Sequence, residues 1–434
     1  MRSLRRITAA SARNWLAGGA AIGIAACMSV SSPGAGTGGN VPVVSGGYKK
    51  GSEQLVRIAL VTSGPEGRVS GTGQWNLLEG PAETPSGSHD PNTEWTISAV
   101  ASRLVPAPAG GTPGNAVDRI AVRSAEAGFV TWNGKRFRGD LVITATDSGL
   151  LVVNVLSMDS YLRGVVPLEI GNRTSAEMAA VQAQAVAART YAYKHLNGSR
   201  AFDMYSTVQD QVYGGVDAEK PLSDSAIATT ADIVVLYGGQ PISTPYHSTC
   251  GGSTAAVTEV WYDQKDEPYL RPVSDKIPGS DKFYCDPSPR FSWTQNFDAA
   301  GLRAVMEKYL ATYTQAPKGG VGRVRDVREQ GRTQSGRLAA LTVETDSGSY
   351  TLRGNDIRFV LRDPKGTILN STFIDVVATK DGREVSALTV NGRGYGHGIG
   401  MCQWGAIGRA RAGQSFRTIL ETYYPGTTIG RIAG

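Results

Sequence analysis

Residues 394–406 read Gly394-Tyr395-Gly396-His397-Gly398-Ile399-Gly400-Met401-Cys402-Gln403-Trp404-Gly405-Ala406. Four glycines alternate through seven residues around one of the four histidines of the chain. Glycine at this density is costly in backbone entropy, and it marks close backbone approach or a positive φ. The pattern therefore predicts a loop that holds a histidine, a cysteine and a glutamine at the edge of a groove. A plain Gly-rich turn before a helix is the alternative.

Composition and charge limit the classes of protein to which this chain can belong. The chain has 434 residues, of which 41% are hydrophobic, and this is enough for one large or two modest cores. The formal net charge is +6, and the basic residues are spread along the chain without a Lys/Arg block. This distribution argues against nucleic acid as a partner. It suits an anionic polymer such as a cell-wall glycan.

The N-terminal residues predict export. Three arginines lie within the first six residues, and an apolar stretch follows over residues 15–26. This stretch has the length of a signal-peptide core and is short for a membrane span. Residues 24–27, Ile-Ala-Ala-Cys, resemble a bacterial lipobox, which predicts a signal peptide over 1–26 and a lipid on Cys27. A plain secretory signal is the alternative, and both place the mature chain outside the cytoplasm, with membrane contact only through the anchor.

The composition of residues 27–52 predicts a tether, and the pattern of residues 53–158 predicts a β-rich part. The tether is mostly Gly, Ser, Pro and Val and carries little charge. Strands are predicted at 55–61, 95–100, 120–122, 129–132 and 141–145, where β-branched and aromatic residues cluster. Asn133-Gly134 is a hairpin turn signal between two of these β segments.

A strong helix signal follows. Thr174 and Glu177 have the spacing of a capping box, and apolar residues then recur at steps of three and four. This predicts a helix over 175–195, and its alanines indicate close packing against other backbone. Gln182, Gln184 and Arg189 lie off the apolar stripe, and an ordinary polar face is the simplest explanation for them.

The rest of the chain predicts an α+β protein. A catalytic core over 159–289 contains a second helix at 223–230 and a strand at 233–237. A smaller α+β lobe over 290–390 precedes the Gly-His-Gly loop, and residues 391–434 complete the core. The lobe should hold helices at 299–310 and from 354, with strands at 324–329, 339–344 and 349–352, and the C-terminal part helices at 407–412 and 416–424.

Four segments together carry a family resemblance. They are residues 161–169 (Tyr-Leu-Arg-Gly-Val-Val-Pro-Leu-Glu), 184–191 (Gln-Ala-Val-Ala-Ala-Arg-Thr-Tyr), 246–252 (Tyr-His-Ser-Thr-Cys-Gly-Gly) and the Gly-His loop at 396–406. In order and spacing they resemble the stage II sporulation protein D family, also called the SpoIID/LytB domain, over roughly residues 55 to 430. The resemblance implies either a lytic transglycosylase acting on peptidoglycan glycan strands or an enhancer of cell-wall amidases.

The resemblance also assigns residues. It implies that Glu169 is the catalytic acid. The other residues that match the family motifs are Gln184, Arg189, Tyr191, His247, Ser248, His397 and Gln403. Gln209 lies in the polar and aromatic segment 205–215, and it is a further candidate for lining the cleft. The chain departs from many members at Cys402, where a small residue is common, and at Ile170, where methionine is common. Neither departure removes a catalytic group.

Elementary chemistry supports a role for Glu169. A glycoside hydrolase needs two carboxylates, whereas a lytic transglycosylase needs one, which acts first as acid and then as base. The first step requires a protonated carboxyl group, and burial among apolar neighbours raises the pKa in the required direction. The alternatives are a surface glutamate near a helix, a glycan-binding module that recruits an amidase without cleaving a bond, and a purely structural envelope protein.

The remaining cysteines leave three arrangements open. In an oxidising envelope Cys250 and Cys285 would form a disulfide and leave Cys402 unpaired. Alternatively, Cys250, Cys285 and Cys402 with His247 or His397 supply the ligand types of a structural zinc site, and the resemblance adds that some family members hold zinc. Free thiols are the third arrangement. The chemistry expected of Glu169 requires no metal.

Overall fold

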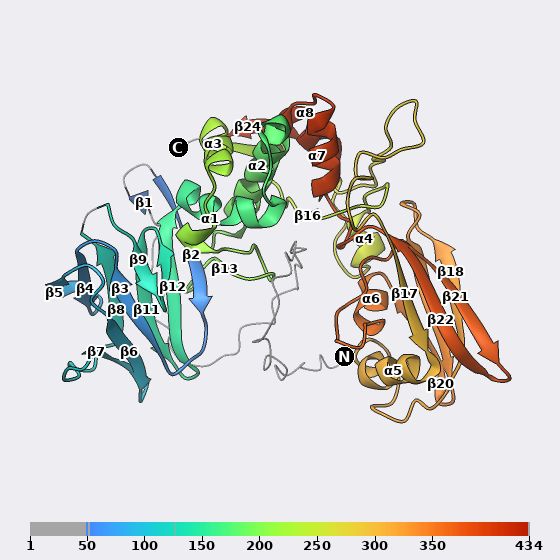
Figure 1. Cartoon of the computed structure of the whole chain (residues 1–434), viewed down its shortest axis with the longest axis horizontal. Coiled ribbons are helices and arrows are strands. Elements are labelled where there is room, and N and C mark those ends of the chain that lie inside the picture. The colour runs from blue at the N-terminus through green and yellow to red at the C-terminus, as the bar shows by residue number, and fades with distance from the viewer. Residues whose placement is uncertain (1–48, 51–52, 126, 433–434) are drawn as a thin grey trace.

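The computed structural model describes residues 49–50, 53–125 and 127–432. The predicted signal peptide, the predicted lipid site at Cys27 and nearly all of the predicted tether lie outside the described residues. The fold is mixed α and β, with the N-terminal part mostly β, as the sequence predicts. In Figure 1 the N-terminal sheets lie at the left, a lobe of later strands lies at the right, and helices connect the two.

The N-terminal part is a sandwich of two sheets. The larger sheet has the order β1-β2-β12-β11-β8-β4-β5, and β13 joins β2 in parallel. Its strands are β1 (Lys49–Lys50), β2 (Glu53–Val61), β4 (Trp75–Glu79), β5 (Thr84–His89), β8 (Arg119–Ser124), β11 (Asp140–Thr146), β12 (Gly149–Ser157) and β13 (Met204–Tyr205). The second sheet, in the order β10-β9-β3-β6-β7, contains β3 (Glu66–Gly71), β6 (Trp95–Val100), β7 (Arg103–Pro108), β9 (Val130–Trp132) and β10 (Lys135–Phe137).

Alternating burial explains the sandwich. On β2, Val56 and Ile58 are fully buried in the main core, whereas Ala59 belongs to a small cluster on the other face of the sheet. Side chains at alternate positions of a strand point to opposite faces, so one strand serves both clusters. The predicted Asn-Gly turn is confirmed: Asn133 and Gly134 have φ of 49° and 79° between β9 and β10. Both values are positive, as a type I′ hairpin requires.

The centre of the molecule is helical. It contains α1 (Met158–Ile170), the 3₁₀ helices η1 (Ser175–Glu177) and η2 (Gly215–Ala218), α2 (Met178–His195), α3 (Pro221–Thr229), α4 (Val257–Val260), α7 (Gln403–Arg411) and α8 (Phe416–Tyr423). Short strands accompany these helices: β14 (Ile233–Tyr237) pairs with β15 (Gln240–Pro241) and β24 (Thr428–Arg431), and β16 (Tyr246–His247) pairs in parallel with β23 (Met401–Cys402).

Helix α2 forms the middle of this region. It covers the residues predicted to be helical, and η1 forms the first turn with the predicted capping box of Thr174 and Glu177. The helix is buried on several sides, because Gln184 and Arg189 are also fully buried. The plain polar-face explanation for these two residues is therefore wrong.

The sequence did not predict helix α1 as a helix. Gly164 and Pro167 both lie within it, and these residues normally weaken or end helices. Packing explains the glycine, because a Cβ atom at position 164 would lie 2.4 Å from the ring of Tyr213. The carbonyl of Gly164 also accepts a hydrogen bond from the backbone nitrogen of Gly214 at 3.0 Å. Tertiary contacts therefore hold the helix where the local sequence disfavours it.

The lobe has its own core, made of residues between 297 and 390. Its elements are β17 (Ser292–Asp298), α5 (Ala299–Tyr313), β18 (Val324–Arg332), β19 (Leu338–Thr345), β20 (Gly348–Arg353), α6 (Asn355–Val360), β21 (Ile374–Asp381) and β22 (Glu384–Arg393). They form two three-stranded sheets, β17-β22-β21 and β18-β19-β20. The predicted elements of the lobe are all present, and β17, β21 and β22 are additional.

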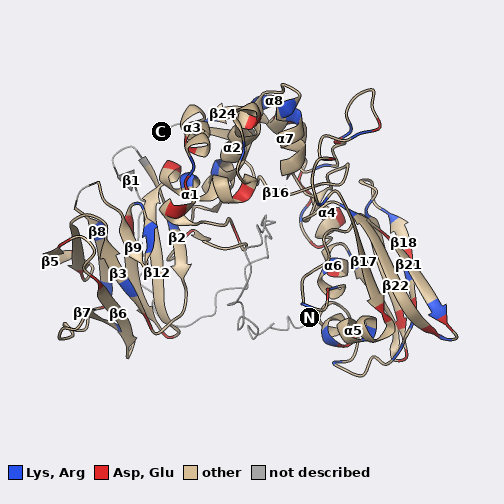
Figure 2. Ribbon diagram, viewed as in Figure 1, with Lys and Arg blue, Asp and Glu red and all other residues tan. Residues whose placement is uncertain are grey.

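Two general features bear on the candidate partners. Within the described part of the chain, no helix combines the length and the apolar character needed to cross a bilayer. Figure 2 shows basic and acidic residues interspersed on the strands of the lobe and on the central helices.

Candidate active site

Glu169 lies in the last turn of α1, directly after the apolar run that the sequence analysis singled out. Its side chain is fully buried, and Val165, Val166 and Ile170 around it belong to the main core. The preceding residue, Leu168, is 37% exposed and points to another side of the helix. The helix thus carries one polar side chain into an apolar setting.

Only neutral groups bind the Glu169 carboxyl group. Its Oε1 accepts a hydrogen bond from the backbone nitrogen of Val212 at 3.1 Å. Burial raises the pKa of Glu169 to about 8, although the hydrogen bonds from Val212 and from the Tyr246 hydroxyl oppose the rise. No charged residue is among the causes of this shift. The carboxyl group is therefore mostly protonated at neutral pH.

Two glutamines meet at Glu169. The Nε2 of Gln403, the first residue of α7, donates to the backbone oxygen of Glu169 at 3.0 Å. The same nitrogen donates to Oε1 of Gln184 on α2 at 3.2 Å. Three segments that are far apart in the sequence thus converge, and the structure brings together three of the predicted site residues.

Three polar atoms at this junction are buried and have no hydrogen-bond partner among the described residues. They are Oε2 of Glu169, Nε2 of Gln184 and Oε1 of Gln403. Buried polar atoms in proteins are nearly always paired, so unpaired ones require an explanation such as ordered water or a ligand. The set contains a carboxyl oxygen, an amide donor and an amide acceptor, and a polyhydroxylated molecule could satisfy all three.

Behind the carboxyl group lies a hydrogen-bonded chain of side chains that the sequence did not predict. The Tyr161 hydroxyl donates to Oε1 of Gln211 at 3.1 Å, and Nε2 of Gln211 donates to the Tyr246 hydroxyl at 3.0 Å. Gln211 is fully buried, whereas the predicted Gln209 is exposed and contacts Thr207 in the same loop. Both glutamines lie in the polar and aromatic segment noted in the sequence. The sequence indicated only that this segment as a whole could line a cleft, and it did not show which glutamine is buried.

The Gly-His loop is held by His397. Its Nδ1 accepts from the backbone nitrogen of Ile399 at 3.0 Å, so its Nε2 carries the proton and donates to the backbone oxygen of Tyr246 at 3.0 Å. Burial lowers the pKa of His397 well below its usual value, and the nearby His247 and Arg358 act in the same direction. Both ring nitrogens are thus used within the protein, and the ring positions the loop next to Tyr246.

The glycines of this loop permit the close approach that the sequence predicts. Gly400 has φ of 70°, and a Cβ atom there would lie 2.0 Å from the backbone oxygen of Pro245. Gly398 has φ of 89°, and a Cβ atom there would lie 2.4 Å from the guanidinium group of Arg337. These two positions accept only glycine without movement of the surrounding residues.

Arg189 and Tyr191 on α2 bind other parts of the protein. The Arg189 guanidinium group donates to the backbone oxygens of Ile227, Thr230 and Ile233 at 3.2, 2.8 and 3.3 Å, and it thereby holds the end of α3. The Tyr191 hydroxyl donates to Oδ1 of Asp210 at 3.0 Å. Arg189 thus braces the helices around the site. Tyr191 braces the loop that carries Val212.

The predicted metal ligands lie next to this site. Cys250, Cys285 and Cys402 are free and buried, and the Sγ atoms of Cys250 and Cys285 are 3.5 Å apart. Their thiols and the carboxyl group of Asp275 lie within 4.8 Å of one another, and His247 is not part of this set. The Nδ1 of His247 donates to the backbone oxygen of Ile399 at 3.1 Å. Ser248 is buried, and its hydroxyl contacts that of Thr249 at 3.2 Å.

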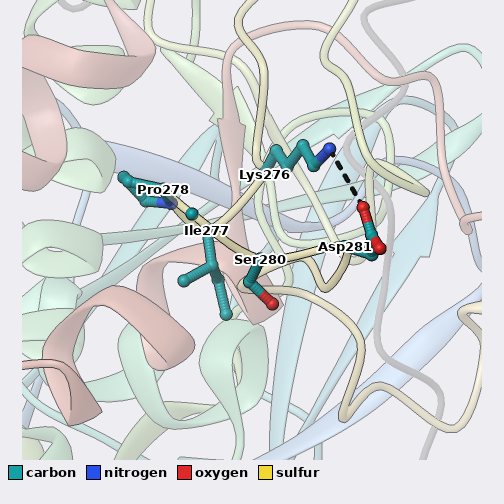
Figure 3. Close-up of a pocket in the computed structure, with 6 residues that line it drawn as sticks. Lys276, Ile277, Pro278, Ser280 and Asp281 are labelled. Atoms are coloured by element: carbon teal, nitrogen blue, oxygen red, sulfur yellow. Dashed lines mark hydrogen bonds and ion pairs between the residues drawn. The ribbon is translucent and has the colours of Figure 1, made fainter.

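Surface hollows occur elsewhere in the structure. One of about 340 Å³ is lined by residues 276–281, where Lys276 and Asp281 form an ion pair at 3.4 Å (Figure 3). Another, of about 440 Å³, lies on the lobe and is lined in part by Trp293, Phe373 and Arg393. Neither hollow is lined by a residue predicted for the site.

Comparison with known proteins agrees with these motifs. A family model described as stage II sporulation protein matches residues 146–237, and a model described as a domain of unknown function, DUF8618, matches residues 277–400. The first match contains Glu169 and all of α2. The second contains the lobe and the beginning of the Gly-His loop.

Three relatives are similar over most of the described chain. An uncharacterized protein of Brachyspira hyodysenteriae is 31% identical over 71% of this chain and 76% of its own length. Stage II sporulation protein D of Bacillus subtilis is 30% identical over 64% of this chain and 75% of its own length. The amidase enhancer of Bacillus subtilis is 32% identical over 62% of this chain, but the match spans only 40% of that longer protein. Sequence and site together show that the chain belongs to the stage II sporulation protein D family.

Proposed function

We propose that this protein cleaves the glycan strands of peptidoglycan as a lytic transglycosylase, with Glu169 as its single acid and base. The observation that carries the proposal is the state of the Glu169 carboxyl group. It is fully buried, hydrogen-bonded only by neutral groups, and protonated at neutral pH because burial raises its pKa to about 8. A carboxyl group in this state is a general acid ready for use.

The reaction needs no second carboxylate. Glu169 gives its proton to the glycosidic oxygen as the bond from that oxygen to C1 of the muramoyl sugar breaks. The C6 hydroxyl of the same sugar then bonds to C1, and its proton passes to the Glu169 carboxylate. The product carries a 1,6-anhydromuramoyl end, the acid is regenerated, and no water is consumed. A hydrolase would need another carboxylate nearby, and none contributes to the Glu169 pKa.

The unpaired polar atoms suit a sugar. Nε2 of Gln184 can donate to a hydroxyl or acetamido oxygen, and Oε1 of Gln403 can accept from a hydroxyl group. Both atoms belong to the hydrogen-bonded group that also contains the backbone oxygen of Glu169. We therefore assign substrate binding to these two glutamines.

Substrate entry requires the loop that carries Val212 to move. The Glu169 side chain has no exposed surface, and Val212 bonds directly to its Oε1. The exposed part of the same loop includes Val208, which is 49% exposed, and Gln209. Displacement of the Val212 N–H group from Oε1 would open the carboxyl group to a glycan strand.

The second candidate function is a glycan-binding module that recruits or stimulates a cell-wall amidase without cleaving a bond. Two observations favour it: the similarity to the amidase enhancer of Bacillus subtilis, and the complete burial of Glu169. In this case the two glutamines would bind glycan, and Glu169 would serve as a neutral hydrogen-bonding residue.

The experiment compares the wild-type protein with Glu169→Gln on peptide-free and peptide-bearing glycan strands, with products analysed by mass spectrometry. Glu307→Gln, on α5 of the lobe, is the matched control. We expect 1,6-anhydro ends from the wild type and from the control. In Glu169→Gln the rate should fall by about 10²–10⁴-fold, which is the usual contribution of general acid–base catalysis.

The wild-type rate should fall about tenfold per pH unit above pH 8, because only the protonated acid acts.

Other outcomes would change the conclusion. Free reducing ends would mean hydrolysis and a second carboxylate. Glycan binding without products in any variant, together with stimulation of an added amidase, would establish the recruiting module.

We also propose that the chain is exported and that Cys27 carries a lipid anchor in the cell envelope. The sequence pattern at residues 24–27 supports this proposal. Metabolic labelling with a clickable fatty acid should mark the wild-type protein and not Cys27→Ser. Labelling of both proteins, or of neither, would refute an anchor at this residue.

A further inference from the structure

An arginine without an ionic partner lies beside the elements that form the candidate site. Arg173 follows α1, in the segment that leads to the capping box of Thr174 and Glu177. Its side chain is partly buried, and among the described residues its guanidinium group has no ion-pair or hydrogen-bond partner. The Nε atom is itself buried. Because buried polar groups are nearly always paired, this group requires an explanation.

Two contacts place the guanidinium group between the segments that carry the site. It lies over the ring of Trp404, 5.3 Å from the ring centre. Trp404 directly follows Gln403, whose amide group donates to the backbone oxygen of Glu169. On its other side, Nη2 of Arg173 lies 3.1 Å from the position that a Cβ atom would take at Gly171. The group therefore lies beside both the end of α1 and the start of α7.

The surrounding charges leave Arg173 without a counterion. Burial lowers the pKa of Arg173, an effect that Glu177 opposes and Arg411 strengthens. Both oxygens of the Glu177 carboxylate are already used, because Oε1 accepts from Arg411 at 2.9 Å and Oε2 accepts from the backbone nitrogen of Thr174 at 3.0 Å. An arginine stays protonated under such conditions. Two guanidinium groups thus share one carboxylate, and the region has an excess of positive charge.

We propose that Arg173 binds a carboxylate group on the side group of the muramoyl sugar and thereby helps to hold the glycan strand at Glu169. This inference deepens the proposed function, and it rests on the assignment of glycan binding to Gln184 and Gln403. The muramoyl sugar carries a lactyl ether, which ends in a free carboxylate when the strand bears no peptide. When a stem peptide is attached, that carboxyl group becomes an amide, and the peptide supplies carboxylates instead.

The geometry of the arginine suits such a group. A guanidinium group presents parallel N–H donors that match the two oxygens of a carboxylate. Stacking on Trp404 fixes the plane of these donors and leaves their outer edge available. A carboxylate bound there would satisfy the buried Nε atom and would relieve the repulsion between Arg173 and Arg411.

A purely structural role is the alternative. The contact between Arg173 and Trp404 connects the segment after α1 to the start of α7, and this connection requires no anion. It would leave the Nε atom of Arg173 without a partner. The two roles differ in one measurable respect, because only the first depends on the charge of the glycan strand.

The test measures glycan binding by the full-length chain with the substitution Glu169→Gln, so that strand cleavage does not enter the measurement. Peptide-free and peptide-bearing strands are each tested before and after carbodiimide coupling to methylamine, which converts their carboxylates to neutral amides. Unmodified strands should bind about 10- to 100-fold more tightly than amidated ones, the range for a hydrogen bond to a charged group. A difference seen only with peptide-free strands identifies the lactyl carboxylate, and one seen only with peptide-bearing strands identifies the stem peptide.

Variants of Arg173 in the same background assign the effect to this residue. Arg173→Gln should bind unmodified strands about 10- to 100-fold more weakly and amidated strands as tightly as the parent chain. Arg173→Lys keeps the charge without the planar donors, so it should retain more of the preference than Arg173→Gln. Arg417→Gln is the matched control, because Arg417 also lies over an aromatic ring, that of Phe416 at 5.4 Å, but on α8. It should keep the full preference for unmodified strands.

Several results would overturn the inference. Equal binding of unmodified and amidated strands by the parent chain would show that no carboxylate is recognised, and this comparison needs no Arg173 variant to fold. An equal loss of affinity for both kinds of strand in Arg173→Gln would assign Arg173 a structural role. Loss of the preference in Arg417→Gln would attribute it to the overall charge. A wild-type protein that cleaves no strand would refute the transglycosylase, whereas charge-dependent binding through Arg173 would still support this inference.

Discussion

Glu169 and Asp275 are both fully buried carboxyl groups, and they lie on either side of the start of α7. Gln403 contacts the first of them, and the preceding residue, Cys402, belongs to the cluster of the second. Each accepts from a tyrosine hydroxyl, and they differ in the second partner. Glu169 is bound by a backbone N–H group and a hydroxyl, whereas Asp275 is bound by a hydroxyl and the guanidinium group of Arg409.

This difference sets how far burial raises the pKa of each carboxyl group, to about 8 for Glu169 and to about 7 for Asp275. Burial alone disfavours the charged form of a carboxyl group, and neutral donors only partly offset this effect. A buried guanidinium group favours the charged form by direct attraction. We conclude that the surroundings of Glu169 suit a proton donor. Burial also raises the pKa of Asp275, to about 7, and the Tyr423 hydroxyl and Arg409 only partly oppose this rise.

The largest expected effect on stability follows from removing the cation beside Asp275. Arg409→Gln removes the cationic partner of the Asp275 carboxylate, and breaking a buried ion pair costs up to about 3–5 kcal/mol where the carboxylate is charged. Because the Asp275 pKa is raised to about 7, the charged form prevails only above pH 7. We therefore expect the loss in the free energy of unfolding, measured with urea, to be larger at pH 9 than at pH 6.

Arg271 provides the exposed control. Its guanidinium group pairs with Asp266 at 2.7 Å, and the two side chains are 43% and 46% exposed. Exposed pairs contribute about 0–1 kcal/mol, so Arg271→Gln should change stability far less. Equal losses in the two variants would mean that Asp275 does not depend on Arg409.

The next effect concerns the proton on Glu169. The folded protein holds this proton up to a pH of about 8, whereas the unfolded chain releases it near the ordinary value of 4.5. Between these values the folded state binds more protons, so the wild type loses stability as the pH rises, by up to about 1.4 kcal/mol per unit. Glu169→Gln has no such proton, and it should gain about 2–3 kcal/mol relative to wild type between pH 5 and pH 7.

Urea unfolding at several pH values measures this difference. Glu307→Gln is the control, because a hydrogen bond from Gly320 and the nearby Arg303 lower the pKa of Glu307. It should show no gain relative to wild type with rising pH. A pH-independent difference between wild type and Glu169→Gln would show that the Glu169 carboxyl group is not held protonated.

The structure also shows which features were predictable from sequence. Local patterns were sufficient for the capping box at Thr174, the helix over 175–195 and the Asn-Gly hairpin, because each depends on neighbouring residues alone. The convergence of Glu169, Gln184 and Gln403 was accessible only through the family resemblance. Their distances in the chain carry no information on contact.

Other features depend on partners that are distant in the sequence. Helix α1 contains Gly164 and Pro167, and the contacts made by Gly164 come from the distant ring of Tyr213 and backbone nitrogen of Gly214. Gln209 and Gln211 lie in one polar loop without periodicity, so the sequence could not tell which is buried. Asp275 shows no local signal either, because it approaches the three thiols only through the folding of segments that are distant in the sequence.

The smallest expected effect tests how Glu169 is held. Tyr246→Phe removes a hydroxyl that lowers the Glu169 pKa and leaves Nε2 of Gln211 without its closest acceptor. An unsatisfied buried donor costs about 1–2 kcal/mol, and the high-pH limb of activity should move to higher pH.

Tyr213→Phe is the control, because it removes a buried hydroxyl that donates to Asn154 at 2.8 Å. Its stability should fall by a similar amount while the pH limb stays in place. A limb that moves equally in both variants would mean that Tyr246 acts through packing, and the neutral surroundings that distinguish Glu169 from Asp275 would then need another source.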